Sequence, residues 1–363
     1  MAYTTIDNPA LFFNTVLYTG DLQDSDGTGH TQSITGVGFQ PDWVWHKGRS
    51  GARTHLLVDR VRGVSSYNWI ASNSNGAELT TNTNGAISSI DSDGITVQNG
   101  NDSSSKSNNA GKNGETWVFW NWLAGGTTSS NGNGSITSTV SVNTTAGFSI
   151  VSYTGTGSAA TVGHGLGVAP KMIIVKNLDS SENWGVWHTG IDADEYLGLN
   201  QTSAKATNTA IWNNTLPTSS VFSVANNART GGSDDYVAYC FAEVKGFSRF
   251  GSYVGNGSSD GSYIHLGFRP AWVMIKRTNA SSTSWVIHDN KRNPFNSVDA
   301  RLWADLTNAS TTSSSYNIDF LSNGFKTRNT NSLVNTSGGS YIYMAFAEHP
   351  FVTEGTKAAG TAR

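Results

Sequence analysis

The residues best suited to catalysis are carboxylates that end two repeated apolar runs. Glu243 and Glu348 each follow a stretch of aromatic and aliphatic residues. Two acids at matched places are what acid–base hydrolysis requires. The first copy of the run has Ala124 at this place, so the role shared by the copies does not need an acid. We therefore expect both glutamates to be solvated or capping groups at strand ends, and we assign no catalytic residue.

Metal binding is the second chemistry to consider. His46, His55, His188 and His288 show neither the spacing of paired metal ligands nor a neighbouring cysteine cluster. His188 and His288 occupy corresponding places in two repeats, which would suit a shared ligand, but a satisfied core or sheet-edge histidine is favoured. The segment 24–27, Asp-Ser-Asp-Gly, resembles the start of a calcium loop without its twelfth-position glutamate. No metal and no cofactor are expected.

Three lysines recur at one place in the repeats. Lys47, Lys176 and Lys276 each follow an apolar run, where we expect the strand to reach water. Lysine at such a place discourages edge-to-edge pairing of sheets, and this interpretation is favoured over contact with a common partner.

Aromatic residues within polar segments are the best candidates for ligand contact. A ring in a loop rich in Asn and Ser is suited to stacking on the face of a sugar. Tyr67 and Trp69 fit this description best, and Trp212 and Trp303 are further candidates for glycan contact. Burial beneath a long loop is the alternative for each ring.

Composition favours a folded, β-rich protein. The 363 residues include 40 Gly, only 13% are charged, and 11% are aromatic, so helix is disfavoured and a packed core is expected. The net charge of −3 gives no basic surface for nucleic acid. Cys240 is the single cysteine and lies in an apolar run, where it is expected to pack as a small hydrophobe. We expect neither a signal peptide nor membrane insertion.

The chain contains three copies of one module. Each copy has a tyrosine strand, a strand after Gly-x-x-Pro, a middle strand with Trp or His, and a closing aromatic strand. The Gly-x-x-Pro strands lie in Val37–Lys47, Leu166–Lys176 and Leu266–Lys276. The tyrosine strands include Leu17–Gly20, Ser152–Gly155 and Ser252–Gly255; the middle strands include Thr54–Asp59, Trp184–His188 and Trp285–Asp289; the closing strands include Glu115–Trp122, Tyr236–Glu243 and Tyr341–Glu348.

These repeats predict an all-β architecture of three tandem, lectin-like antiparallel β-sandwich modules with long polar loops. The expected boundaries are module 1 at 1–126, a Ser/Thr/Asn/Gly linker at 127–146, module 2 at 147–248, module 3 at 249–352 and a C-terminal tail at 353–363.

The motifs resemble a repeated, uncharacterised module of structural proteins from tailed bacteriophages, especially marine ones, found in tail fibres and virions. The resemblance rests on Phe13–Gly20, on Gly147–Gly155, on the Gly-x-x-Pro strands and on the closing Ala-Phe-Ala-Glu. It extends over nearly the whole chain. It implies a virion location after synthesis in the bacterial cytoplasm, and it assigns no reaction, ligand or catalytic residue.

Two functions follow as hypotheses. The first is a non-enzymatic tail-fibre or appendage protein that attaches the particle to its host, with a surface glycan as ligand and a homo-oligomer, favoured as a trimer. The alternative is a decoration protein that coats or stabilises the capsid, which is raised because no heptad stalk or repeated shaft precedes the first module. An enzyme such as a depolymerase would need convergent acids, and the sequence offers none. The expected partners are other virion proteins.

Overall fold

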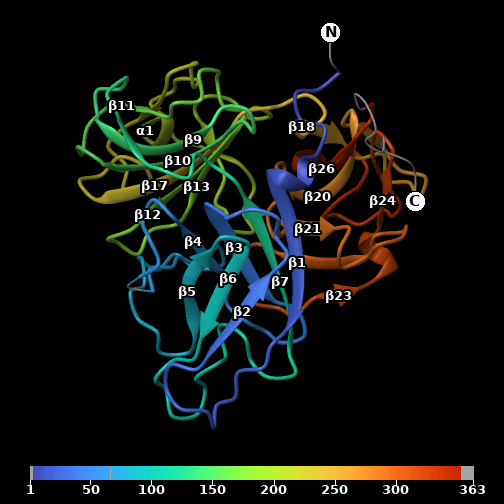
Figure 1. The fold of residues 1–363 in the computed structure, drawn as a ribbon. Coiled ribbons are helices and arrows are strands. Elements are labelled where there is room, and N and C mark those ends of the chain that lie inside the picture. The colour runs from blue at the N-terminus through green and yellow to red at the C-terminus, as the bar shows by residue number, and fades with distance from the viewer. Residues whose placement is uncertain (1–2, 66, 353–363) are drawn as a thin grey trace.

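The computed structural model describes residues 3–65 and 67–352, and these form antiparallel sheets with very little helix (Figure 1). The helical segments of this part of the chain are α1 (Thr209–Trp212) and the single 3-10 turns η1 (Pro9–Leu11) and η2 (Ser314–Tyr316). The all-β prediction is therefore confirmed. The expected tail at 353–363 lies outside the described residues.

One four-stranded sheet occurs three times, once in each predicted module. It has the same strand order and antiparallel pairing each time, with the closing strand in the interior between the tyrosine strand and the Gly-x-x-Pro strand. In module 1 these strands are β1 (Phe13–Thr19), β7 (Thr116–Trp122), β3 (Trp43–Gly48) and β4 (Leu56–Asp59). In module 2 they are β10 (Phe148–Thr154), β17 (Asp235–Phe241), β12 (Met172–Asn177) and β13 (Gly185–His188); in module 3 they are β18 (Ser248–Val254), β26 (Ser340–Pro350), β20 (Phe268–Arg277) and β21 (Val286–Asp289).

The repeated glycine and tyrosine have the same structural role in each sheet. Gly38, Gly167 and Gly267, three residues before the repeated proline, have φ of 88°, 74° and 80°, a region that favours glycine. The tyrosine stacks on an aromatic residue directly opposite on the closing strand, with interplanar angles of 14–16°. The pairs are Tyr18–Trp117, Tyr153–Tyr236 and Tyr253–Tyr341. These cross-strand pairs explain why the motifs recur together.

Smaller sheets accompany the three main sheets. They are β2 (Thr31–Thr35), β6 (Gly94–Gln98) and β5 (Ala86–Asp91); β11 (Ala160–Gly163) and β16 (Val221–Val224); β14 (Glu195–Tyr196) and β15 (Ala206–Thr207); and β19 (Tyr263–His265), β25 (Gly324–Thr327) and β24 (Ile318–Leu321). Each module has a separate hydrophobic cluster that joins a main sheet to a small one. In module 3 the main sheet continues through β22 (Ala300–Trp303) and β23 (Thr311–Thr312).

The predicted linker at 127–146 is instead part of a sheet. β9 (Ser138–Asn143) pairs with β10 along five residues, and β8 (Ser129–Asn131) pairs with β9. Val140 is 3% exposed because its side chain packs into the core of module 2. The segment therefore adds two strands to the module 2 sheet. β18 begins at Ser248, one residue before the predicted start of module 3.

The inner faces of the three sheets share one aromatic core. Module 1 contacts module 2 where the rings of Trp43 and Tyr239 stack 4.3 Å apart between centroids. Modules 1 and 3 meet at the stacked rings of Phe13 and Phe346, 5.0 Å apart. The ring of Phe346 also lies 6.1 Å from that of Phe241 in module 2. One buried cluster thus contains residues from all three modules.

The three modules close into a ring around this core. Figure 1 shows three lobes, coloured blue to cyan, green to yellow, and orange to red in chain order. The first and last parts of the described chain meet at Gly267, whose carbonyl accepts hydrogen bonds from the Tyr3 hydroxyl at 2.6 Å and the Phe351 amide at 3.3 Å. In the part of the chain that the structure describes, no helix has the length and apolar character needed to cross a membrane.

Candidate functional site

The predicted glycan-contacting rings are mostly buried. Trp69, Trp212 and Trp303 are 7%, 2% and 9% exposed because they pack in the hydrophobic clusters of their modules, which leaves no open face for a sugar. This burial argues against their expected contact role. Tyr67 remains half-buried, and its hydroxyl donates to Gln98 Oε1 at 3.0 Å. The structure does not gather the four rings into one site.

An exposed ring that the sequence reasoning missed lies in module 3. Phe295 is 76% exposed, at the tip of the loop that follows β21. The loop is held in place because the Asn296 side chain donates to the Phe320 carbonyl and accepts from the Phe320 amide, both at 2.9 Å. The sequence feature that could have revealed this ring is the segment 293–297, Asn-Pro-Phe-Asn-Ser, in which an aromatic residue lies among polar residues.

A polar pocket of about 410 Å³ lies next to this loop. The Ser297 hydroxyl, two residues from Phe295, lies 3.2 Å from the side-chain amide of Asn317, which lines the pocket. Hydroxyl, amide and guanidinium groups form the walls: Ser259, Ser314, Ser315, Asn317, Arg328, Asn329, Thr330 and Asn331. Arg328 is fixed by Asp260 and Asp319, so its guanidinium is oriented before any ligand arrives.

The three repeated lysines do not reach water. Lys47, Lys176 and Lys276 all have 0% exposure, which corrects the prediction of solvated strand ends. Their ammonium groups donate to backbone carbonyls: Lys47 donates to Thr307 at 2.8 Å, Lys176 to the adjacent Asn177 at 2.6 Å, and Lys276 to Thr283. Burial lowers the pKa of Lys47 to about 7 and the pKa values of Lys176 and Lys276 to about 8.

The predicted equivalence of His188 and His288 is wrong by one residue. His188 pairs with Met172, whereas the residue paired with the equivalent Trp272 is Asp289. His288 pairs with Val273 and therefore points to the opposite face of the sheet. Both histidines are fully buried, and burial lowers their pKa values to about 4 and about 3. His46 and His55 are also buried, with lowered pKa values.

The corrected alignment reveals a repeated buried ion pair. In modules 1 and 3 an aspartate ends the middle strand and an arginine follows three residues later, as Asp59 with Arg62 and Asp289 with Arg292. The Nε–Oδ2 distances are 2.6 and 2.5 Å, and each aspartate also accepts two backbone amides. Module 2 has His188 at this place.

This position also joins each module to the next. The Tyr239 hydroxyl of module 2 donates to Asp59 at 2.9 Å, and the Trp120 indole of module 1 donates to Asp289 at 3.1 Å. In module 2, His188 Nε2 lies 3.1 Å from the Tyr343 carbonyl of module 3. The contacts run cyclically from 1 to 2, 2 to 3 and 3 to 1, so these polar groups have a structural role.

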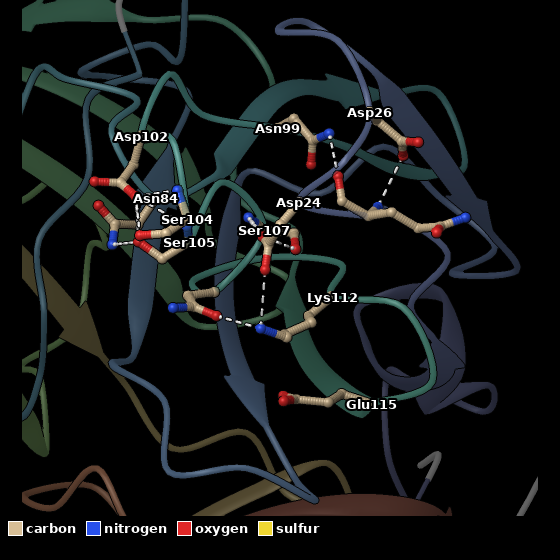
Figure 2. Close-up of polar contacts among 12 residues, drawn as sticks. Asp24, Asp26, Asn84, Asn99, Asp102, Ser104, Ser105, Ser107, Lys112 and Glu115 are labelled. Carbon is tan, nitrogen blue, oxygen red and sulfur yellow. Dashed lines mark hydrogen bonds and ion pairs between the residues drawn. The ribbon is translucent and has the colours of Figure 1, made fainter.

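The remaining candidates are engaged in local contacts. Glu348 pairs with Arg269 at 2.9 Å, and exposed Glu243 accepts from the Phe250 amide at 3.4 Å. Figure 2 shows Asp24 turned towards Ser107 and Lys112, and the Lys112 ammonium lies 3.1 Å from the carboxylate. The charge of Asp24 is thus balanced by Lys112. Residues 3–65 and 67–352 contain no group of three or more His, Cys, Asp or Glu arranged to hold a metal.

Together these features define an all-β protein in which one sheet motif is repeated three times around a shared aromatic core. The chain belongs to the family described as "Domain of unknown function (DUF7483)", whose model matches residues 8–350 in one span. No curated protein and no solved structure matches the chain.

Proposed function

We propose that this chain is a non-enzymatic surface protein of a tailed-bacteriophage virion that attaches the particle to its host by contacting a surface glycan. The observation that carries the proposal is the exposed ring of Phe295 on a fixed loop beside the polar pocket of about 410 Å³. An exposed ring and oriented polar groups are the two elements of sugar recognition. The virion location rests on the sequence resemblance.

The buried polar groups also support the proposal of a non-enzymatic, structural protein. The lysines, histidines and Asp–Arg pairs lie inside the molecule, and three of these residues, Asp59, His188 and Asp289, link its modules. Such a body holds its loops in fixed relative positions, which lowers the entropy cost of binding an extended surface.

A capsid decoration protein is the second candidate. It is favoured by an open hollow of about 600 Å³ that brings Tyr3 together with residues of module 2, among them Val168, which is 53% exposed. An exposed apolar residue at the rim of a broad hollow suits contact with a neighbouring subunit.

The test is to locate the protein on intact particles and then to compete for adsorption. Gold-labelled antibody at the tail supports attachment, label spread over the shell supports decoration, and particles without label reject both. Purified protein is expected to reduce particle adsorption, and Phe295→Ala is expected to weaken this competition. Leu216→Ala is the matched control, because Leu216 is 57% exposed but lies in module 2.

A further inference from the structure

The contact region between two neighbouring modules is here called a seam. The seam between modules 1 and 2 and the seam between modules 3 and 1 differ at one pair of equivalent positions. In module 1, Arg60 and Asp42 form an ion pair at 3.0 Å, and Asp42 Oδ2 also accepts the Ala124 amide at 2.7 Å. This pair lies next to Trp43, which stacks on Tyr239 of module 2 and marks the seam between modules 1 and 2. The matching backbone contact identifies the same positions in module 3. Arg60 N donates to the Asp42 carbonyl at 2.9 Å, and Asn290 N donates to the Ala271 carbonyl at 2.8 Å. Alanine and asparagine therefore replace the ion pair in the seam between modules 3 and 1.

The smaller side chains leave a cavity of about 270 Å³ in that seam. Its lining combines small apolar walls with polar groups: Asn8, Ala10, Phe13, Asn14, Thr15, Ala271, Asn290, Lys291, Ala347, Glu348 and His349. The lining comes from both ends of the described chain, since Asn8–Thr15 lie in η1, β1 and the residues around them and Ala347–His349 lie in β26.

Two polar atoms of the lining residues have no partner. Asn290 Oδ1 and Thr15 Oγ1 are buried without a hydrogen bond, and each residue is only 4% exposed. A buried oxygen without a donor is costly, so such an atom is normally satisfied by an ordered water molecule, an ion or a ligand. The amide oxygen needs a donor, and the hydroxyl accepts or donates.

We propose that this seam cavity binds a single saccharide ring. Sugar hydroxyls both donate and accept, which suits Asn290 Oδ1 together with Thr15 Oγ1. The alanines and Phe13 offer an apolar wall for the C–H face of a pyranose. A volume of about 270 Å³ lies just below the range of roughly 300–1,000 Å³ that is typical of ligand pockets, so it suits one ring. This inference deepens the proposed glycan recognition and rests on it.

The experiment measures binding of a panel of neutral monosaccharides to the full chain by saturation-transfer NMR and calorimetry. Thr15→Val removes the hydroxyl without changing shape and is expected to weaken binding about five- to tenfold, the usual effect of one hydrogen bond. The double variant Ala271→Asp with Asn290→Arg rebuilds the ion pair of the other seam and is expected to abolish binding by filling the cavity. Leu216→Ala, which is 57% exposed in module 2 and lines neither this cavity nor the module 3 pocket, is the control and is expected to bind like the unmodified protein.

The inference is overturned if no sugar of the panel binds, or if the double variant binds as well as the unmodified chain. Thermal unfolding shows whether the double variant folds, and the Thr15→Val titration decides the outcome if it does not. Adsorption competition separates the two proposals. If the protein blocks adsorption but binds no sugar in the seam cavity, the attachment proposal stands and the cavity proposal is rejected. If the protein binds a sugar in the seam cavity but is absent from particles, the cavity proposal stands and the attachment proposal is rejected.

Discussion

At the scale of single residues, the interior holds three histidines in their neutral form. Burial lowers the pKa values of His46, His188 and His288 to about 3, 4 and 3. An exposed histidine titrates near 6.5. The folded protein therefore resists taking up protons that its unfolded chain accepts readily.

Acid is expected to destabilise the protein well above the range in which most carboxylates titrate. Between about pH 6.5 and about pH 4 the unfolded chain binds protons that the folded chain does not, so the free energy of unfolding falls as pH falls. Each buried histidine contributes a slope of up to about 1.4 kcal/mol per pH unit. Urea unfolding of the unmodified chain and of His188→Gln measures this, and equal stability at about pH 7 and about pH 5 would contradict it.

Mildly alkaline pH is expected to increase the free energy of unfolding because of the buried lysines. Lys47, Lys176 and Lys276 have folded pKa values of about 7, 8 and 8, and exposed lysine titrates near 10.4. Between about pH 7 and about pH 9 the unfolded chain holds more protons, so stability rises with pH. From about pH 8.5, where an exposed thiol ionises, the buried Cys240 thiol acts against the trend because burial raises its pKa.

Melting temperatures measured between about pH 7 and about pH 9 check this expectation. The melting temperature of the Lys47→Met variant is expected to rise less steeply with pH than that of the unmodified chain. A melting temperature that falls throughout the window contradicts it. The sequence could place the lysines at strand ends but could not reveal the loops that cover them, because the covering contacts come from distant residues such as Thr307.

At the scale of elements, the Asp–Arg pair after the middle strand fixes a turn and a seam together. The side chain of Asp289 accepts the Arg292 amide, pairs with the Arg292 guanidinium and accepts the Trp120 indole. Sequence comparison of the middle strands aligned the wrong residues here. A one-residue slip between strands exchanges their two faces, and only the pairing register resolves it.

Asp289→Ala is expected to destabilise the protein by about 3–5 kcal/mol, because it leaves the Arg292 charge buried and unpaired. Asp260→Ala removes a carboxylate that is 77% exposed and is expected to change stability far less than Asp289→Ala. Denaturant unfolding of the two variants measures both effects. Similar small losses for both would show that the pair contributes little.

The strands of residues 127–146 give a second element-scale prediction. The amides of β9 that bond to β10 are expected to exchange with solvent as slowly as those of β10, whereas a linker would exchange at once. Val140→Ala is expected to cost about 1–3 kcal/mol, and exposed Ser130→Ala little. The alternating apolar signal was present at Val140 and Val142, but the surrounding Ser, Thr and Asn residues hid it.

At the scale of the whole molecule, the shared core couples the three modules. The repeats in the sequence revealed the threefold recurrence of the strands, and the all-β class followed from them. The shared core was harder to foresee, although closing strands such as Thr116–Trp122 are apolar on both sides. Such a run indicates burial of both sheet faces but does not say what covers the second face.

Thermal unfolding is expected to occur in one calorimetric transition, because no module can leave the ring without exposing its inner face. Trp122→Ala, in the shared core, is expected to lower stability by about 3–5 kcal/mol and to keep the transition single. Three separate transitions, or a monomeric folded fragment of residues 127–248, would show that the modules are independent.

Closure of three unequal repeats by one chain also affects how the surface can vary. In an assembly of three identical subunits, every substitution appears three times, and all sides keep the same chemistry. Here the loops of each module have their own sequence, as Tyr67, Leu216 and Phe295 illustrate. A mutation alters one side and leaves the other two as they were. The ring therefore permits three different recognition chemistries around one axis, each open to change without the others.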